Sequence, residues 1–144
     1  MRLKTSTKLA LAGGASVLYF STAVILKYTY VPPEIPRGDK IFALHRPFST
    51  FGKFAAHVKL PPYLSGIADT PDQPNRSPVI IYEGVQRLGP GHVGHGEIAE
   101  YGHGRFSHWQ DQAVFSSTDG TSPNQNGREY WAVLPEDRRA VKPE

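Results

Sequence analysis

The densest group of side chains that could do chemistry is a histidine-rich stretch. Four of the six histidines lie within 17 residues, together with two glutamates. Histidine with carboxylate is a common ligand set for zinc and other divalent metals. The spacing does not match the His-Glu-x-x-His zinc helix, and the frequent glycines disfavour a stable helix. Two alternatives stay open: a metal site, or a tight loop whose histidines bond to backbone carbonyls or sugar hydroxyls. The metal candidates are His92, His95, Glu97 and His103.

Ser107 and His108 are adjacent in the sequence, in the manner of a nucleophile and its base. Because neighbouring residues of a strand point to opposite faces, the two side chains are not expected to touch. No Gly-x-Ser-x-Gly motif and no third orienting group accompany them. The sequence therefore predicts no catalytic residue here, and it favours a buried, hydrogen-bonded core role for His108.

A polar loop over residues 118–127 precedes a stretch with Arg128, Tyr130 and Trp131. One carboxylate, Asp119, is too few for a calcium site of the EF-hand type. A guanidinium beside aromatic rings suits a hydroxyl-rich or anionic ligand, although a solvated arginine at a sheet edge would give the same pattern. We expect the polar loops to meet at one end of a sheet and form a ligand site. The predicted ligand-binding residues are His92, His95, Arg105, Trp109, Asp119, Asn126, Arg128 and Tyr130.

Short β signals dominate the part of the chain that would position these residues. Strands are predicted over residues 54–60, 79–83, 105–110, 113–117 and 128–134, with one helical turn at 97–101 closed by Gly102. Asn126-Gly127 favours a type I′ turn, and Phe106 should meet Phe115 across a hairpin. The predicted fold is mainly β, a small antiparallel sandwich or jelly-roll-like sheet with one N-terminal transmembrane helix.

The N-terminus differs from the rest in charge and hydropathy. Residues 1–31 hold four basic residues and no acid, with an uncharged run of 18 residues at 9–26. Such a run is just long enough for a membrane helix. Three basic residues precede it and one follows it, which predicts a cytoplasmic N-terminus. A signal peptide cleaved near Ser21-Thr22-Ala23 is the main alternative, and a buried soluble helix is the third.

Four segments follow from this division. We predict a signal anchor at 1–30, a Pro-rich stalk and entry segment at 31–53, a β-rich exported domain at 54–134 and a charged tail at 135–144. The expected location is the cytoplasmic membrane, with a single span and the bulk of the chain in the periplasm. Gly13 and Gly14 would let a partner membrane helix approach closely.

Charge and composition restrict the partners. The formal net charge of +3 comes from the N-terminus, because residues 32–144 hold twelve basic and thirteen acidic residues. A nearly neutral folded part argues against nucleic acid as a partner. The chain has no cysteine, which excludes a disulfide scaffold and thiolate chemistry. No cofactor is predicted.

Several short motifs carry a resemblance to a known module. They are Asn75-Arg76-Ser77, Leu88-Gly89-Pro90 with His92 and His95, Gly104–Trp109, Phe115-Ser116-Ser117 with Asp119, and Asn126-Gly127-Arg128 with Tyr130. This set resembles an uncharacterised bacterial module found beside methyltransferase or glycosyltransferase-like domains of envelope polysaccharide gene clusters, here fused to a membrane anchor. The resemblance implies a role in the bacterial envelope.

The sequence thus favours a membrane-anchored, non-catalytic binding or accessory module for envelope glycans or their synthesis machinery. One alternative is a small structural subunit of a membrane protein complex. Another is a metal-dependent envelope hydrolase that uses His92 and His95.

Overall fold

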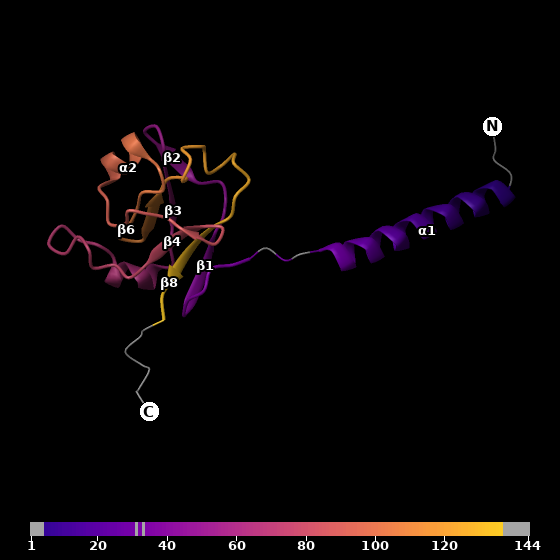
Figure 1. The fold of residues 1–144 in the computed structure, drawn as a ribbon, viewed down its shortest axis with the longest axis horizontal. Helices are drawn as coiled ribbons and strands as arrows, with labels where there is room; N and C mark the ends of the chain where they lie inside the picture. The colour runs from indigo at the N-terminus through magenta and orange to yellow at the C-terminus, as the bar shows by residue number, and fades with distance from the viewer. Residues whose placement is uncertain (1–4, 31, 33, 137–144) are drawn as a thin grey trace, which may run out of the picture. The chain divides into compact units, whose positions relative to one another are not determined.

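The chain forms two compact units, Met1–Pro33 and Glu34–Glu144. The computed structural model describes residues 5–30, 32 and 34–136 (Figure 1). Side chains are described from Gly14 onward. The first unit is one helix, α1 (Thr5–Thr29). Every strand found among the described residues lies in the second unit, so the fold of this unit is mainly β.

Helix α1 covers the uncharged run of the sequence. Within the described part of the chain, no helix is long and apolar enough to cross a membrane. The transmembrane helix of the predicted fold is therefore not found. Residues 1–4 and the side chains of 5–13, on which that prediction partly rests, lie outside the described residues.

The second unit contains two antiparallel four-stranded sheets. The first has the order β1 (Lys40–Leu44), β8 (Tyr130–Leu134), β4 (Ile80–Glu83) and β5 (Gln86–Arg87). The second has the order β2 (Ser49–Phe51), β3 (Ala55–Lys59), β7 (Gln112–Phe115) and β6 (Phe106–Trp109). A short 3-10 helix, η1 (Pro62–Ile67), follows β3.

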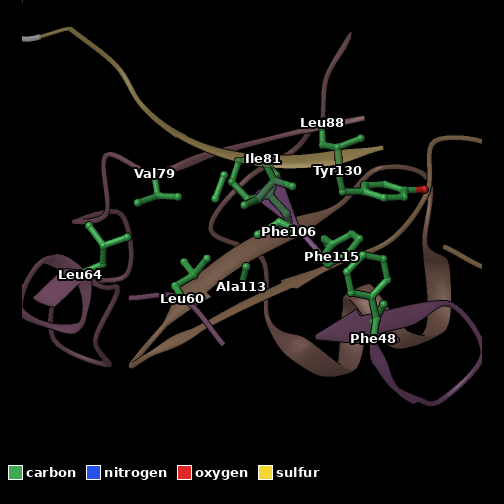
Figure 2. Packing of buried hydrophobic residues seen from close by; sticks show 13 residues of the cluster. Phe48, Leu60, Leu64, Val79, Ile81, Leu88, Phe106, Ala113, Phe115 and Tyr130 are labelled. Atoms are coloured by element: carbon green, nitrogen blue, oxygen red, sulfur yellow. The ribbon is translucent and has the colours of Figure 1, made fainter. Parts of the chain in front are cut away.

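One hydrophobic core joins the two sheets. Its buried side chains come from β1, β4 and β8 of the first sheet and from β3, β6 and β7 of the second. Figure 2 shows Ile81 and Tyr130 facing Phe106 and Phe115 across this core. The rings of Phe115 and Tyr130 lie 4.9 Å apart, and Phe48 packs edge-on against both. Burial of these rings is the main force that holds the sheets together.

The outer face of the second sheet is covered by the short helix α2 (His95–Tyr101), which contacts β3, β6 and β7 (Figure 1). Ile98 and Ala99 of α2 pack against Ala55 and Val114 in a second small cluster. Gly102 ends the helix with φ of +61°, where an added Cβ would lie 2.8 Å from the Phe54 ring. The predicted helical turn is therefore present and starts two residues earlier than expected.

The hairpin prediction agrees with the observed register. Phe106 stands opposite Phe115 in the β6–β7 pair, and both side chains are buried. The type I′ turn at Asn126-Gly127 is wrong, because only Gly127 of that pair has a positive φ. The physical reason is topological: β7 and β8 belong to different sheets, so no two-residue hairpin joins them.

The β-rich unit begins before residue 54. Strands β1 and β2 lie inside the segment predicted as stalk and entry, residues 31–53. Phe48 from this segment is 4 % exposed and belongs to the core. Of the predicted tail at 135–144, residues 137–144 lie outside the described residues.

Candidate functional site

A cavity of about 510 Å³ lies on the outer side of β6, near the start of α2. Three chain segments form its wall: a loop at 69–74, the turn at 92–95 and strand β6. Its lining residues are Asp69, Thr70, Pro71, Pro74, His92, Val93, Gly94, His95, Ser107 and Trp109. This volume falls within the range of small-molecule sites, roughly 300–1,000 Å³.

Backbone contacts hold the three segments in place. The Asp69 amide donates to the His108 carbonyl at 2.9 Å, which docks the 69–74 loop on β6. The Val93 amide donates to the Phe106 carbonyl at 3.2 Å and docks the turn on the same strand. At Gly91 an added Cβ would lie 2.7 Å from the Phe106 ring, so this close approach needs glycine.

The central polar contact of the cavity joins His92 to Asp69. His92 Nδ1 lies 2.9 Å from Asp69 Oδ2 and 3.1 Å from Oδ1. Asp69 is 5 % exposed, and its Oδ1 also accepts from the Ser77 amide at 2.8 Å. A carboxylate can only accept hydrogen bonds, so the His92 proton sits on Nδ1. The lone pair of Nε2 is then left for another partner.

His95 and Ser107 bring further polar atoms to the cavity wall. His95 Nε2 and Ser107 Oγ are buried and have no hydrogen-bond partner among the described residues. Burial, with a smaller effect from the nearby His57, lowers the pKa of His95 and favours its neutral form. The His95 ring meets Trp109 edge-on at 6.1 Å. Beside the Asp69 carboxylate, the cavity therefore has an aromatic wall and two neutral polar side chains, His95 and Ser107.

His108 lies behind the cavity and does not line it. It is 1 % exposed, and its Nδ1 lies 2.7 Å from Ser77 Oγ. Burial lowers the pKa of His108. The interpretation of His108 as a partly buried core histidine is right about its place in the core, but the ring is almost fully buried and its Nε2 has no hydrogen-bond partner among the described residues.

The four metal candidates have different neighbours. His92 contacts Asp69, and His95 contacts Trp109. Glu97 pairs with Arg105 at 3.3 Å, and the His103 ring lies near the Phe54 ring. Among the described residues, no three histidine, aspartate or glutamate side chains gather in a way that could hold a metal ion. A metal site at these residues has no support in the geometry.

The other predicted ligand residues form a separate group around Glu83, at the end of β4. Glu83 Oε1 accepts from Tyr130 at 2.7 Å and from Arg128 at 3.1 Å, and Oε2 accepts from the Thr118 hydroxyl. Arg128 also donates to Asp119 Oδ2 at 2.6 Å, and Asn126 donates to the Tyr130 hydroxyl at 2.8 Å. None of these residues lines the cavity.

The charges of this second group are mutually satisfied. Burial opposes ionisation of Glu83, but hydrogen bonds from Thr118, Tyr130 and Arg128 lower its pKa overall. Hydrogen bonds from Thr121 and Arg128 lower the pKa of Asp119, and those with Asp119 and Glu83 raise the pKa of Arg128. Burial and the Glu83 carboxylate raise the pKa of Tyr130. We call Glu83, Thr118, Asp119, Asn126, Arg128 and Tyr130 the Glu83 network; it fastens the 118–128 loop to β4.

Arg105 belongs to neither group. Its guanidinium donates to Glu97 and to the Gly102 carbonyl at 3.0 Å, and it lies over the Tyr101 ring. It therefore braces α2 against the start of β6.

The eight predicted ligand residues are thus divided by the structure. His92, His95 and Trp109 line one cavity, Asp119, Asn126, Arg128 and Tyr130 join the Glu83 network, and Arg105 supports α2. Asp69, Pro71 and Pro74 of the cavity wall and Glu83, which lies in a predicted strand, were not among the predicted site residues. A polar residue inside a β-branched strand, as at Glu83, was a usable signal for a buried carboxylate.

Comparison of the chain with protein-family models, with curated proteins and with solved structures finds no match.

Proposed function

We propose that the β-rich unit is a non-catalytic binding module for a small hydroxylated ligand, such as a sugar unit of an envelope glycan. The observation that carries this proposal is the cavity on β6, where Trp109 and two prolines accompany the oriented His92–Asp69 pair.

The lining chemistry supports a sugar-like ligand. Sugar rings have apolar C–H faces and polar edges, and Trp109, Pro71 and Pro74 offer apolar surface for such faces. His92 offers a polar partner for hydroxyl groups. Binding sites for small molecules usually combine apolar walls with a few placed polar groups.

The same geometry favours binding over hydrolysis. Ser107 Oγ is buried in strand β6 and makes no hydrogen bond to any described histidine, and the Ser77–His108 pair is almost wholly inaccessible. A nucleophile needs an adjacent base and access to substrate. These hydroxyls therefore make poor nucleophiles.

The test is titration of the full chain with glucose, galactose and N-acetylglucosamine, followed by tryptophan fluorescence and by amide and indole NMR shifts. We expect shifts at the Trp109 indole and at residues 92–95. Trp109→Ala should abolish the sugar-induced amide shifts at residues 92–95. Trp131→Phe, a change in β8 that does not touch the cavity lining, is the matched control and should leave binding intact. Failure of all three sugars to move these signals would refute the proposal.

We also propose that α1 attaches the module to the cytoplasmic membrane, with the β-rich unit on the outer side. The support is the uncharged run at 9–26 and its flanking basic residues. In addition, large apolar side chains of α1, such as Leu18, Phe20 and Ile25, are exposed. A reporter fused after Glu144 should be active outside the cytoplasm and should fractionate with membranes. Recovery of the full-length chain in the cytoplasmic soluble fraction would contradict this part.

A further inference from the structure

We propose that the Asp69–His92 pair makes the cavity selective for neutral ligands that donate a hydroxyl, and that it rejects anionic ligands. This inference rests on the proposed binding function and names the ligand class that the site would take.

The first step concerns the direction of the hydrogen bond at His92. Asp69 fixes the proton on Nδ1, so Nε2 can only accept while His92 is neutral. Among the described residues, His92 Nε2 has no hydrogen-bond partner, and the His92 side chain is 29 % exposed. A ligand that bonds to the neutral His92 ring must therefore present a donor, such as a hydroxyl, to Nε2.

The second step concerns charge. The cavity lining includes one carboxylate, Asp69, and no lysine or arginine. His95 does not offset this charge, because burial lowers its pKa and favours the neutral ring. The Asp69 side chain is 4 % exposed, so water screens its charge poorly. An anionic ligand would meet the negative charge of Asp69 with no lysine or arginine of the lining to offset it.

The third step concerns rigidity. His92 has φ of +60°, a conformation that is uncommon outside glycine and in which asparagine, aspartate and histidine are enriched. Such strained positions persist where the surrounding structure holds them, and they cluster at functional sites. The neighbouring contacts of Gly91 and Val93 with Phe106 supply that support. The imidazole is therefore presented at a fixed place beside Asp69.

The experiment compares matched sugar pairs on the full chain, namely glucose with glucuronate and galactose with galacturonate. Each pair differs mainly by one carboxylate. We expect the neutral sugar to bind at the Trp109 indole and the uronate to bind about tenfold more weakly or not at all. Equal or tighter binding of the uronates at Trp109 would overturn the selectivity while leaving the binding function intact. If none of the four sugars binds, both proposals fall.

Variants of Asp69 and His92 separate the rejection of anionic ligands from the binding of hydroxyl groups. Asp69→Asn should bring the affinity of each uronate to within about threefold of its neutral partner. Asp72→Asn removes the same charge from an exposed position of the same loop and should change nothing. His92→Asn tolerates the positive φ and removes the imidazole acceptor. It should weaken neutral sugars about tenfold and keep the rejection of uronates, which tests the proposal even if Asp69→Asn does not fold.

A ligand-free measurement tests the hydrogen-bond direction alone. Long-range ¹H–¹⁵N spectra, recorded where the His92 ring is neutral, should show its proton on Nδ1. A proton on Nε2 would overturn the acceptor role.

Discussion

The cavity on β6 and the Glu83 network contain similar residue types but treat polar groups in opposite ways. In the Glu83 network both carboxylate oxygens and the Tyr130 hydroxyl have protein partners. In the cavity, His92 Nε2 and Ser107 Oγ have none among the described residues. Satisfied polar groups stabilise a fold, whereas unsatisfied ones beside a hollow leave room for a ligand. The sequence predicted a single site that held residues of both groups, and the structure separates them.

The largest loss of stability is expected from a change in the core, because the cavity and the Glu83 network both depend on it. Phe115 is fully buried, stacks on Tyr130 and stands opposite Phe106. Phe115→Ala should lower the free energy of unfolding by about 3–5 kcal/mol. Denaturant unfolding followed by tryptophan fluorescence measures this loss. Val85→Ala, at a half-exposed position, is the control and should change stability by less than about 0.5 kcal/mol. A neutral Phe115→Ala would contradict the shared core.

Loss of the Glu83 carboxylate should separate the two regions. Glu83→Gln removes the charged acceptor for Tyr130 and Arg128 and should cost about 2–3 kcal/mol of stability. Sugar binding at Trp109 should not change, because Glu83 does not line the cavity. Urea denaturation and the Trp109 titration together test both statements. A variant of normal stability that no longer binds sugar would reverse the roles that we assign.

Acid should act on the two regions in different pH ranges. The pKa values of His95 and His108 are lowered by burial, so the unfolded chain takes up protons first and stability falls as pH drops below about 6.5. The folded pKa of Glu83 is lowered overall, so its contribution is present above 4.5 and is lost as pH falls from there through the folded pKa. The free energy of unfolding, measured as a function of pH, should decline in two separate pH ranges. Glu83→Gln should weaken only the more acidic one, and loss of the upper decline in that variant would contradict the assignment.

The smallest stability effect is expected at His92. His92→Asn keeps a side chain compatible with the positive φ and should cost no more than about 1 kcal/mol, while it weakens sugar binding. Thermal unfolding and the Trp109 titration give the two values. A loss of several kcal/mol would make the His92–Asp69 contact a structural one and would remove the main support for the cavity as a ligand site.

Local signals in the sequence were sufficient for much of the β-rich unit. β-branched and aromatic residues mark β4 and β8, and the Phe106/Phe115 pairing follows from alternation around a short turn. The sequence also indicated that His108 is buried and that Ser107 and His108 do not act together. These features depend on neighbours close in the chain, so periodicity and turn chemistry were enough to find them.

The tertiary structure decided which distant residues meet. Asp69 and His92 are 23 positions apart, and Glu83 and Arg128 are 45 apart. The docking of two loops on β6 brings Asp69 to His92, and the pairing of β4 with β8 brings Glu83 to Arg128. No local pattern encodes these long-range contacts. The same reason explains why 40–51 joined the fold: β1 pairs with β8 from the far end of the chain. The sequence by itself indicated strands β3, β4, β6, β7 and β8 and the polar residues, but not β1, β2 and β5. Only the long-range packing decided which of those polar residues leave a hollow between them.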